Sequence, residues 1–182
     1  MNRSEDTLAR ILELDAAISR RLRVAERPGV LRSIATVLAH SGDSWFWLLA
    51  LALLAIWGDG FWQARARFLI VAILTTAVVV MTIKFTVRRR RPEGEWGAIY
   101  RSTDPHSFPS GHAARAIMLG VAALVIGPPW LGATVVIWAP LVALARVAMG
   151  VHFLSDVLAG GLLGALMAWV NLFLLQGLFA LS

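Results

Sequence analysis

Three short clusters of the chain combine residue types that can bind and transfer a phosphoryl group. The clusters are Lys84 with Arg91-Pro92, the segment Pro109-Ser110-Gly111-His112, and Arg146 with His152 and Asp156. Cationic side chains hold phosphate oxygens. A histidine can attack phosphorus or exchange a proton near neutral pH. The residue types therefore indicate phosphoryl-transfer chemistry.

The first cluster follows a long apolar stretch and contains the only lysine of the chain, Lys84. Arg91 offers a planar fork for two phosphate oxygens, whereas Lys84 adds a compact point charge. The residues from Arg88 to Arg90 are expected to lie at the membrane interface, where they contact anionic lipid headgroups. Taken alone, the cluster also fits an ordinary basic stop-transfer signal at the end of a span.

The second cluster predicts the start of a helix that can bind an anion. Pro109 disfavours helix for the residue before it, and Ser110 is a good N-cap for the apolar stretch that follows. The backbone N–H groups of Gly111 and His112 then lie at a positive helix end, which readily binds phosphate. His112 is suited to donating a proton to a leaving oxygen, although an interfacial histidine after an ordinary cap has the same local sequence.

The third cluster pairs a histidine with a carboxylate. His152 and Asp156 are four residues apart, so on a helix they share one face. The carboxylate can accept the Nδ1–H of the imidazole, which fixes the tautomer and leaves Nε2 free to attack. Arg146 precedes a break at Gly150 and can fold back towards the same point. The alternative is a structural His–Asp pair, but ionisable groups near a membrane are costly, which favours a functional role.

The composition is that of an integral membrane protein. Of the 182 residues, 58% are apolar and 15% are charged, and the mean hydropathy is +0.71. Soluble domains are only about 45–50% apolar. The chain has no cysteine, which excludes disulfides, thiolate nucleophiles and cysteine zinc sites. We therefore expect one membrane-embedded domain over residues 1–182 with an all-α fold.

The apolar stretches predict a transmembrane helical bundle of about five spans, preceded by amphipathic helices that lie in the membrane interface. Residues 1–43 form the interfacial part, because apolar residues recur at helical spacing over 5–24 and again from Val30. Residues 44–182 form the catalytic core. Its expected spans are 45–57 (extendable to 62), 68–87, 110–127, 130–149 and 155 to the C-terminus.

Two further features of the spans bear on the site. The fifth span contains Gly160, Gly161 and Gly164, small residues that suit close helix packing. The order of the spans places all three clusters at the same membrane surface. Because two histidines, a helix start and three cations converge there, the clusters together indicate one phosphoryl-transfer site.

The three clusters resemble the motifs of the type 2 phosphatidic acid phosphatase family, whose soluble relatives include vanadium haloperoxidases and acid phosphatases. Lys84 to Pro92 matches Lys, six residues, Arg-Pro, and Pro109 to His112 matches Pro-Ser-Gly-His. Arg146 to Asp156 matches Arg, five residues, His, three residues, Asp. The resemblance covers about Lys84 to Gly164. One departure is Ala145, where the family often has a serine.

This resemblance implies a metal-independent lipid phosphatase that needs no cofactor. His152 would attack phosphorus and form a phosphohistidine, with Asp156 orienting the ring. His112 would protonate the departing lipid oxygen and then activate water for the second step. The phosphoryl oxygens and the charge that develops on them would be held by Lys84, Arg91, Arg146, Ser110 and the N–H of Gly111.

A phosphatase site at a membrane surface suggests a lipid phosphate whose tail stays in the bilayer. Phosphatidic acid, phosphatidylglycerol phosphate and polyprenyl phosphates or diphosphates all fit. The segment Ser107 to Arg115 looks similar to family members that act on isoprenoid diphosphates, so we favour a polyprenyl substrate. The segment Glu93 to His106, with Trp96, Tyr100 and Arg101, is expected to roof the headgroup pocket.

The basic residues also predict an orientation. Of the 17 Lys and Arg residues, only Arg65 and Arg67 fall on the side opposite the site. The positive-inside rule then places the site on the cytoplasmic face of a bacterial cytoplasmic membrane, with the periplasmic face as the alternative.

Three other functions fit parts of the pattern. A haloperoxidase would use the same pocket for vanadate, but the membrane spans argue against it. A non-catalytic phospholipid-binding or transport protein would be expected to lack His112, His152 or Asp156, and all three are present. No nucleic acid partner is expected, because the arginine run has no interleaved aromatic residues. The expected partners are the lipid phosphate substrate and membrane lipids, and no oligomeric state is indicated.

Overall fold

The computed structural model describes residues 3–101, 104–175 and 177–179, and within these ranges the chain forms helices and no β-strand. In chain order the helices are α1 (Arg3–Leu22), α2 (Val30–Ser41), α3 (Ser44–Trp57), α4 (Gly60–Val87), α5 (Glu95–Arg101), α6 (Gly111–Ile126), α7 (Pro129–Ala148) and α8 (Leu154–Leu175). The expected all-α fold is confirmed.

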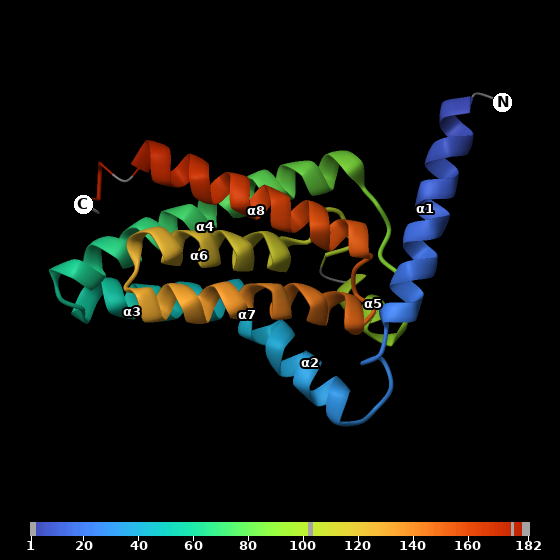
Figure 1. Ribbon diagram of the computed structural model, residues 1–182, viewed down its shortest axis with the longest axis horizontal. Coiled ribbons are helices and arrows are strands. Elements are labelled where there is room, and N and C mark those ends of the chain that lie inside the picture. The colour runs from blue at the N-terminus through green and yellow to red at the C-terminus, as the bar shows by residue number, and fades with distance from the viewer. Residues whose placement is uncertain (1–2, 102–103, 176, 180–182) are drawn as a thin grey trace.

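Five of these helices make a bundle, and the N-terminal helix lies across one end of it. Figure 1 shows α3, α4, α6, α7 and α8 running along a common direction, whereas α1 crosses that direction. Helix α6 is central, because it packs against α4, α7 and α8. The end next to α1 gathers the last turns of α4 and α7 and the first turns of α6 and α8 (Figure 1). These four helix ends carry the three clusters.

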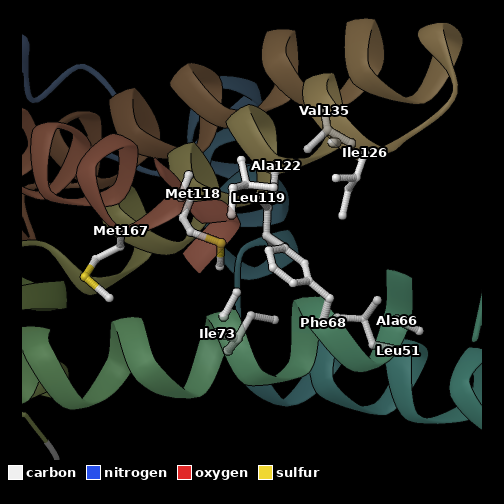
Figure 2. Close-up of a cluster of buried hydrophobic side chains, with 14 residues drawn as sticks. Leu51, Ala66, Phe68, Ile73, Met118, Leu119, Ala122, Ile126, Val135 and Met167 are labelled. Atoms are coloured by element: carbon white, nitrogen blue, oxygen red, sulfur yellow. The ribbon is translucent and has the colours of Figure 1, made fainter. Parts of the chain in front are cut away.

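The core of the bundle is apolar away from that end. Phe68 and Ile73 of α4 are buried against Met118 and Leu119 of α6, and Met167 of α8 closes the cluster (Figure 2). In a membrane the alternative surroundings are lipid, which is as apolar as this core, so these side chains stabilise the bundle through close van der Waals packing. Many large apolar side chains on the outside of the bundle stay exposed. An outside of this kind is expected for a surface that faces lipid.

Within the part of the chain that the structure describes, three helices are long and apolar enough to cross a membrane by themselves, namely α4, α7 and α8. Helices α2 and α3 pass the same test only as a pair that bends by 49° at its break. Helix α6 is apolar but has only 16 residues. The predicted spans therefore correspond to α3, α4, α6, α7 and α8, and the count of about five is approximate.

Close packing of α8 on α6 depends on two glycines. A Cβ atom at Gly160 would collide with the backbone of Ser110, and one at Gly164 would collide with the backbone of Ala114. Gly161, between them, has ordinary space around it, because the nearest atom to its Cβ position would be 3.7 Å away. The predicted role of small residues is confirmed for Gly160 and Gly164, which hold the two helices at backbone contact.

Candidate active site

The three clusters meet at one cavity of about 470 Å³ at the α1 end of the bundle. Lys84 comes from the last turn of α4, Arg146 from the last turn of α7, and Arg91 from the segment after α4. Residues from all three clusters line the cavity: Lys84, Arg91, Gly111, His112, Arg146 and His152. Three cations and two histidines of the clusters thus share one small space with a fourth cation, Arg115.

His152 is almost completely buried and has both ring nitrogens near charged groups. Its Nε2 lies 3.1 Å from Nη1 of Arg91, and its Nδ1 lies 3.5 Å from Oδ2 of Asp156. The second distance is longer than an ordinary hydrogen bond, but catalytic contacts are often long before substrate binds. Burial, together with the positive charges of Arg91, Arg146 and Lys84, lowers the pKa of His152 well below its usual value. These effects favour the neutral imidazole.

Asp156 is fixed from three directions at the start of α8. Its Oδ2 accepts the backbone N–H of Phe153 at 2.9 Å, and its Oδ1 accepts Nη1 of Arg89 at 2.7 Å. Its backbone carbonyl accepts the N–H of Ser110 at 2.9 Å, which ties the start of α6 to the start of α8. The carboxylate is fully buried, so it cannot turn away from the histidine without breaking these bonds.

The expectation that Arg89 lies at the membrane interface is wrong. The side chain is only 17% exposed, donates to the carboxylates of Asp15 and Asp156, and lies over the ring of Phe153. It escaped sequence reasoning because it sits in a run of four arginines, which is typical of a headgroup-binding stretch, and because Asp15 is 74 residues away.

Ser110 and Gly111 have different positions relative to the cavity. Ser110 is the N-cap of α6, where its side chain accepts the N–H of Ala113 at 3.5 Å. It is completely buried and is not among the residues that line the cavity. Gly111 does line the cavity, so the first turn of α6 faces the cations.

A carboxylate that the sequence did not single out, Asp104, sits among the cations of the cavity. It forms ion pairs with Lys84 and with Arg91, the latter at 2.7 Å, and Lys84 also donates to the backbone carbonyl of His106 at 3.1 Å. Burial opposes ionisation of Asp104, but the hydrogen bond and charge of Lys84 and the charge of Arg91 outweigh it and keep the carboxyl pKa below its usual value. Two cations of the cavity are thus paired with an anion of the chain itself.

The predicted roof over the pocket is realised only in part. Asp104 and the carbonyl of His106 reach the cavity cations, whereas Trp96 packs among Ala25, Ala35 and neighbouring apolar residues. The side chains of Tyr100 and Arg101 lie outside the described residues. No signal in the sequence separates Asp104 from a solvated loop aspartate, because its partners come from distant segments.

A second missed carboxylate, Asp43, contacts His112. Asp43 lies in the turn between α2 and α3, and its Oδ1 is 2.7 Å from Nε2 of His112. Its Oδ2 lies 3.1 Å from Nδ1 of His40. Arg115 of α6 holds this turn in place, because its guanidinium donates to the carbonyl of Gly42 and to the hydroxyl of Ser44. Both histidines of the cavity thus have a carboxylate of their own.

One half of the cavity is apolar. Away from the cations, its walls are formed by Ile73, Ala77, Val80 and Met81 of α4 and by Trp45 at the start of α3. A molecule with a phosphate head and a hydrocarbon tail matches both halves. Within the described residues, no group of three or more His, Asp or Glu side chains is placed to hold a metal ion.

Comparison with known proteins places these features in a family. A model of the PAP2 superfamily matches residues 65–178. An undecaprenyl-diphosphatase of Sulfolobus acidocaldarius is 29% identical over 154 residues, 80% of this chain and 70% of that protein. A decaprenylphosphoryl-5-phosphoribose phosphatase of Mycobacterium tuberculosis is 35% identical over 150 residues, 78% of each chain.

A solved structure agrees with the sequence comparisons. The membrane PAP2 type phosphatidylglycerolphosphate phosphatase of Bacillus subtilis superposes with a TM-score of 0.71 at 27% sequence identity, covering 88% of this chain and 84% of that one. The family match includes all three motifs and the helices that carry them, α4 and α6 to α8, and the structural match covers most of the bundle. This chain is an integral membrane protein and belongs to the PAP2 superfamily.

Proposed function

We propose that this protein is a metal-independent lipid phosphatase that works through a phosphohistidine on His152. The observation that supports this most directly is the position of the buried, neutral imidazole. Its Nε2 lies beside Arg91 in the same cavity as Lys84 and Arg146. A phosphoryl group held by these cations would present phosphorus to Nε2.

In the first step, Nε2 of His152 attacks phosphorus and the bond to the lipid oxygen breaks. Asp156 lies on the Nδ1 side, where it stabilises the positive charge that the ring acquires. The cations Lys84, Arg91 and Arg146 offset the negative charge on the phosphoryl oxygens in the transition state. The leaving oxygen takes a proton from His112, so the lipid departs as a neutral alcohol or as a phosphate monoester.

In the second step, His112 takes a proton from a water molecule that attacks the phosphohistidine. The bond between Nε2 and phosphorus breaks, inorganic phosphate is formed, and His152 returns to its neutral state. His112 became neutral when it gave its proton to the leaving oxygen, so the proton taken from water returns it to its starting state. Asp43 stabilises the positive form of His112 in both directions of proton transfer, because its carboxylate is 2.7 Å from Nε2.

Among lipid phosphates, a polyprenyl phosphate or diphosphate is the substrate class that we favour. The apolar half of the cavity suits a hydrocarbon tail that enters between α3 and α4. The names of two relatives specify prenyl lipids, an undecaprenyl-diphosphatase and a decaprenylphosphoryl-5-phosphoribose phosphatase. The name of the Bacillus subtilis neighbour makes phosphatidylglycerol phosphate the second candidate.

The test is release of inorganic phosphate in detergent with EDTA present, from a polyprenyl diphosphate, phosphatidylglycerol phosphate and phosphatidic acid side by side. We expect the wild type to release phosphate from at least one of them, with the prenyl lipid fastest, and His152→Ala to release none. With ³²P-labelled substrate, the wild type should give an acid-labile, base-stable phosphoprotein that the variant lacks. A folded protein that releases no phosphate from any lipid would instead support a binding or transport role.

For the membrane orientation, we propose that the site faces the cytoplasm, in line with the excess of Arg at that end. Because the chain has no cysteine, single cysteines can report the side directly. Glu95→Cys lies at the site end, and Asp59→Cys, in the turn between α3 and α4, lies at the other. In intact cells a membrane-impermeant maleimide should label position 59 and leave position 95 unlabelled. The reverse pattern would place the site outside.

A further inference from the structure

The amphipathic helix α1 is joined to the start of α8 by a set of polar contacts. Oδ1 of Asp15 accepts the backbone N–H of Ser155 at 3.0 Å, and Oδ2 accepts the Ser155 hydroxyl. One residue earlier, the N–H of Leu154 donates to the hydroxyl of Ser19 at 2.8 Å. The first turn of a helix has N–H groups with no partner inside the helix, so side chains of α1 cap α8.

Through Arg89, the same carboxylate reaches the proposed nucleophile. Nη2 of Arg89 donates to Asp15 at 2.7 Å, and Nη1 donates to Oδ1 of Asp156 at 2.7 Å. The other oxygen of Asp156 faces Nδ1 of His152. Asp15, Arg89, Asp156 and His152 therefore form one row of contacting groups, which we call the Asp15 relay.

The rest of α1 presents an apolar face that the bundle does not cover. Leu8, Ile11, Ile18 and Leu22 are 38–58% exposed. At 3.6 residues per turn they lie within about 60° of Asp15 around the helix, on the side that faces the bundle end. Arg10, Glu13 and Arg20 lie on the opposite side, at more than about 120° from Asp15.

The placement of α1 identifies what covers this apolar face. Figure 1 shows α1 across the end of the bundle, at a steep angle to the spanning helices and extending beyond them. If those helices stand in a membrane, α1 lies along its surface with the Leu and Ile side chains directed into the lipid and the charged side chains directed to water. This is the arrangement that interfacial amphipathic helices adopt.

We propose that α1 is bound in the lipid surface by its apolar face and that Asp15 is a positioning residue for His152. The inference rests on the proposed function, since it takes His152 as the nucleophile. The family match begins at residue 65, so α1 lies outside it. In this arrangement, the membrane surface itself holds the helix that caps α8 and that shares the charge of Arg89 between two carboxylates.

Loss of the Asp15 charge should change the orientation of His152 rather than the affinity for substrate. Asp15 is ionised, because the hydrogen bonds from Ser155 and Arg89 outweigh burial and lower its pKa. Without that charge, Arg89 would turn fully to Asp156, and the N–H of Ser155 would lose its charged acceptor, while the Ser19 cap on Leu154 would remain. Both changes displace the carboxylate that orients His152, while the cations that bind the phosphoryl group stay in place. The chemical step should slow and substrate binding should not change.

The first test compares Asp15→Asn with Glu13→Gln, which removes the same charge from the exposed face of the same helix. In vesicles, Asp15→Asn should lower kcat about tenfold or more with KM within twofold, as expected for a small displacement of a reacting group. Asp15→Glu should recover part of kcat, and Glu13→Gln should match the wild type. Unchanged kcat in Asp15→Asn, or an equal effect in both amide variants, would overturn the relay.

The second test concerns the lipid surface and does not depend on activity. Spin labels at Ile11→Cys and Glu13→Cys in vesicles should differ: the label at 11 should collide mainly with oxygen in the lipid, and the label at 13 mainly with a water-soluble nickel complex. Equal exposure of both labels to the nickel complex would show that α1 does not bind the lipid surface.

The outcome for His152 keeps the two proposals apart. If His152→Ala retains activity, the proposed function fails, whatever Asp15 does. If His152→Ala is inactive and Asp15→Asn is fully active, the function stands and the relay fails.

Discussion

Asp43 lies 2.7 Å from Nε2 of His112, although the two residues are 69 positions apart in the sequence. The contact joins the turn between α2 and α3 to the first turn of α6. The cavity therefore contains two histidine–carboxylate pairs, His112 with Asp43 and His152 with Asp156. The two pairs differ in exposure: the His112 side chain is 19% exposed and the His152 side chain 1%. The more exposed pair suits proton exchange with water, and the buried pair suits attack on phosphorus.

This arrangement predicts a leaving-group effect for Asp43→Asn. A lipid alkoxide needs a proton as it leaves, whereas p-nitrophenolate does not. Loss of the Asp43 carboxylate should therefore slow hydrolysis only of the lipid substrate. We expect kcat/KM for a lipid phosphomonoester to fall about 30-fold, within the usual range for general acid catalysis. For p-nitrophenyl phosphate, kcat/KM should stay within threefold of the wild type.

The matched control for Asp43 is Asp59→Asn. Asp59 also precedes a membrane helix, but it caps α4 at the opposite end of the bundle. Asp59→Asn should leave kcat/KM unchanged for both substrates. If Asp43→Asn lowers kcat/KM equally for both substrates, the carboxylate stabilises the turn and does not assist His112 as a general acid.

Asp104 leads to a prediction about anion binding. Its carboxylate pairs with Lys84 and Arg91, two of the cations assigned to phosphate, so an incoming anion must compete with it. Asp104→Asn removes that competition. The inhibition constant of inorganic phosphate should then fall about 5–10-fold, as expected for the loss of one partly buried charge pair.

Glu95→Gln is the control for Asp104. It removes a carboxylate from the same connecting segment, but its partner is Arg32 at the rim of the molecule. The inhibition constant of phosphate should not change in this variant. An unchanged or weaker inhibition by phosphate in Asp104→Asn would mean that the carboxylate orders the pocket instead of closing it.

The sequence predicted the parts of the site that follow from local spacing. Ser110 as an N-cap and the spacing of the small residues of α8 depend on residues within a few positions of one another. His152 and Asp156 do lie close together, but the expectation that they share one helix face is wrong, because α8 begins at Leu154 and His152 lies in the segment before it. The order of the spans was enough to bring the clusters to one end of the bundle.

What the sequence missed depends on contacts between distant segments. Asp15, Asp43 and Asp104 each lie in a polar stretch where an aspartate is usually solvated. Asp43 has one local partner, His40, but its contact with His112 spans 69 positions. Arg89 was misplaced for the same reason. Its two carboxylate partners lie 74 positions before it and 67 positions after it. Only the packing of α1 against α8 brings them together.

The state of His152 gives a prediction for pH. Its pKa is lowered by burial and by the surrounding cations, so the ring should stay neutral where an ordinary histidine, with a pKa of about 6.5, is protonated. In the folded state, the ¹³Cε1 resonance of His152, assigned by its absence in His152→Asn, should not titrate between pH 7.5 and 6. In the unfolded protein it should titrate near 6.5.

The sign of the linked stability change follows from the same shift. Below pH 6.5 the unfolded chain binds a proton at His152 that the folded chain does not, so the free energy of unfolding should decrease as the pH falls. A His152 resonance that titrates at or above pH 6.5 in the folded protein would contradict both the neutral ring and its role as a ready nucleophile.

The packing of α8 on α6 allows a final prediction, because it positions the start of both helices. Gly164→Ala places a methyl group against the backbone of Ala114, which cannot rotate away as a side chain could. We expect a loss of about 1–3 kcal/mol, the usual cost of overpacking. Gly161→Ala adds the same methyl group on a different face of α8, where the nearest atom is a side-chain carbon of Ile117. This substitution should not measurably change the free energy of unfolding. Thermal unfolding in detergent compares the two. Equal stability of the two variants would show that the helices are not held at backbone contact. Because Ser110 donates its N–H to the carbonyl of Asp156, a shift of α8 along α6 should also lower kcat in Gly164→Ala.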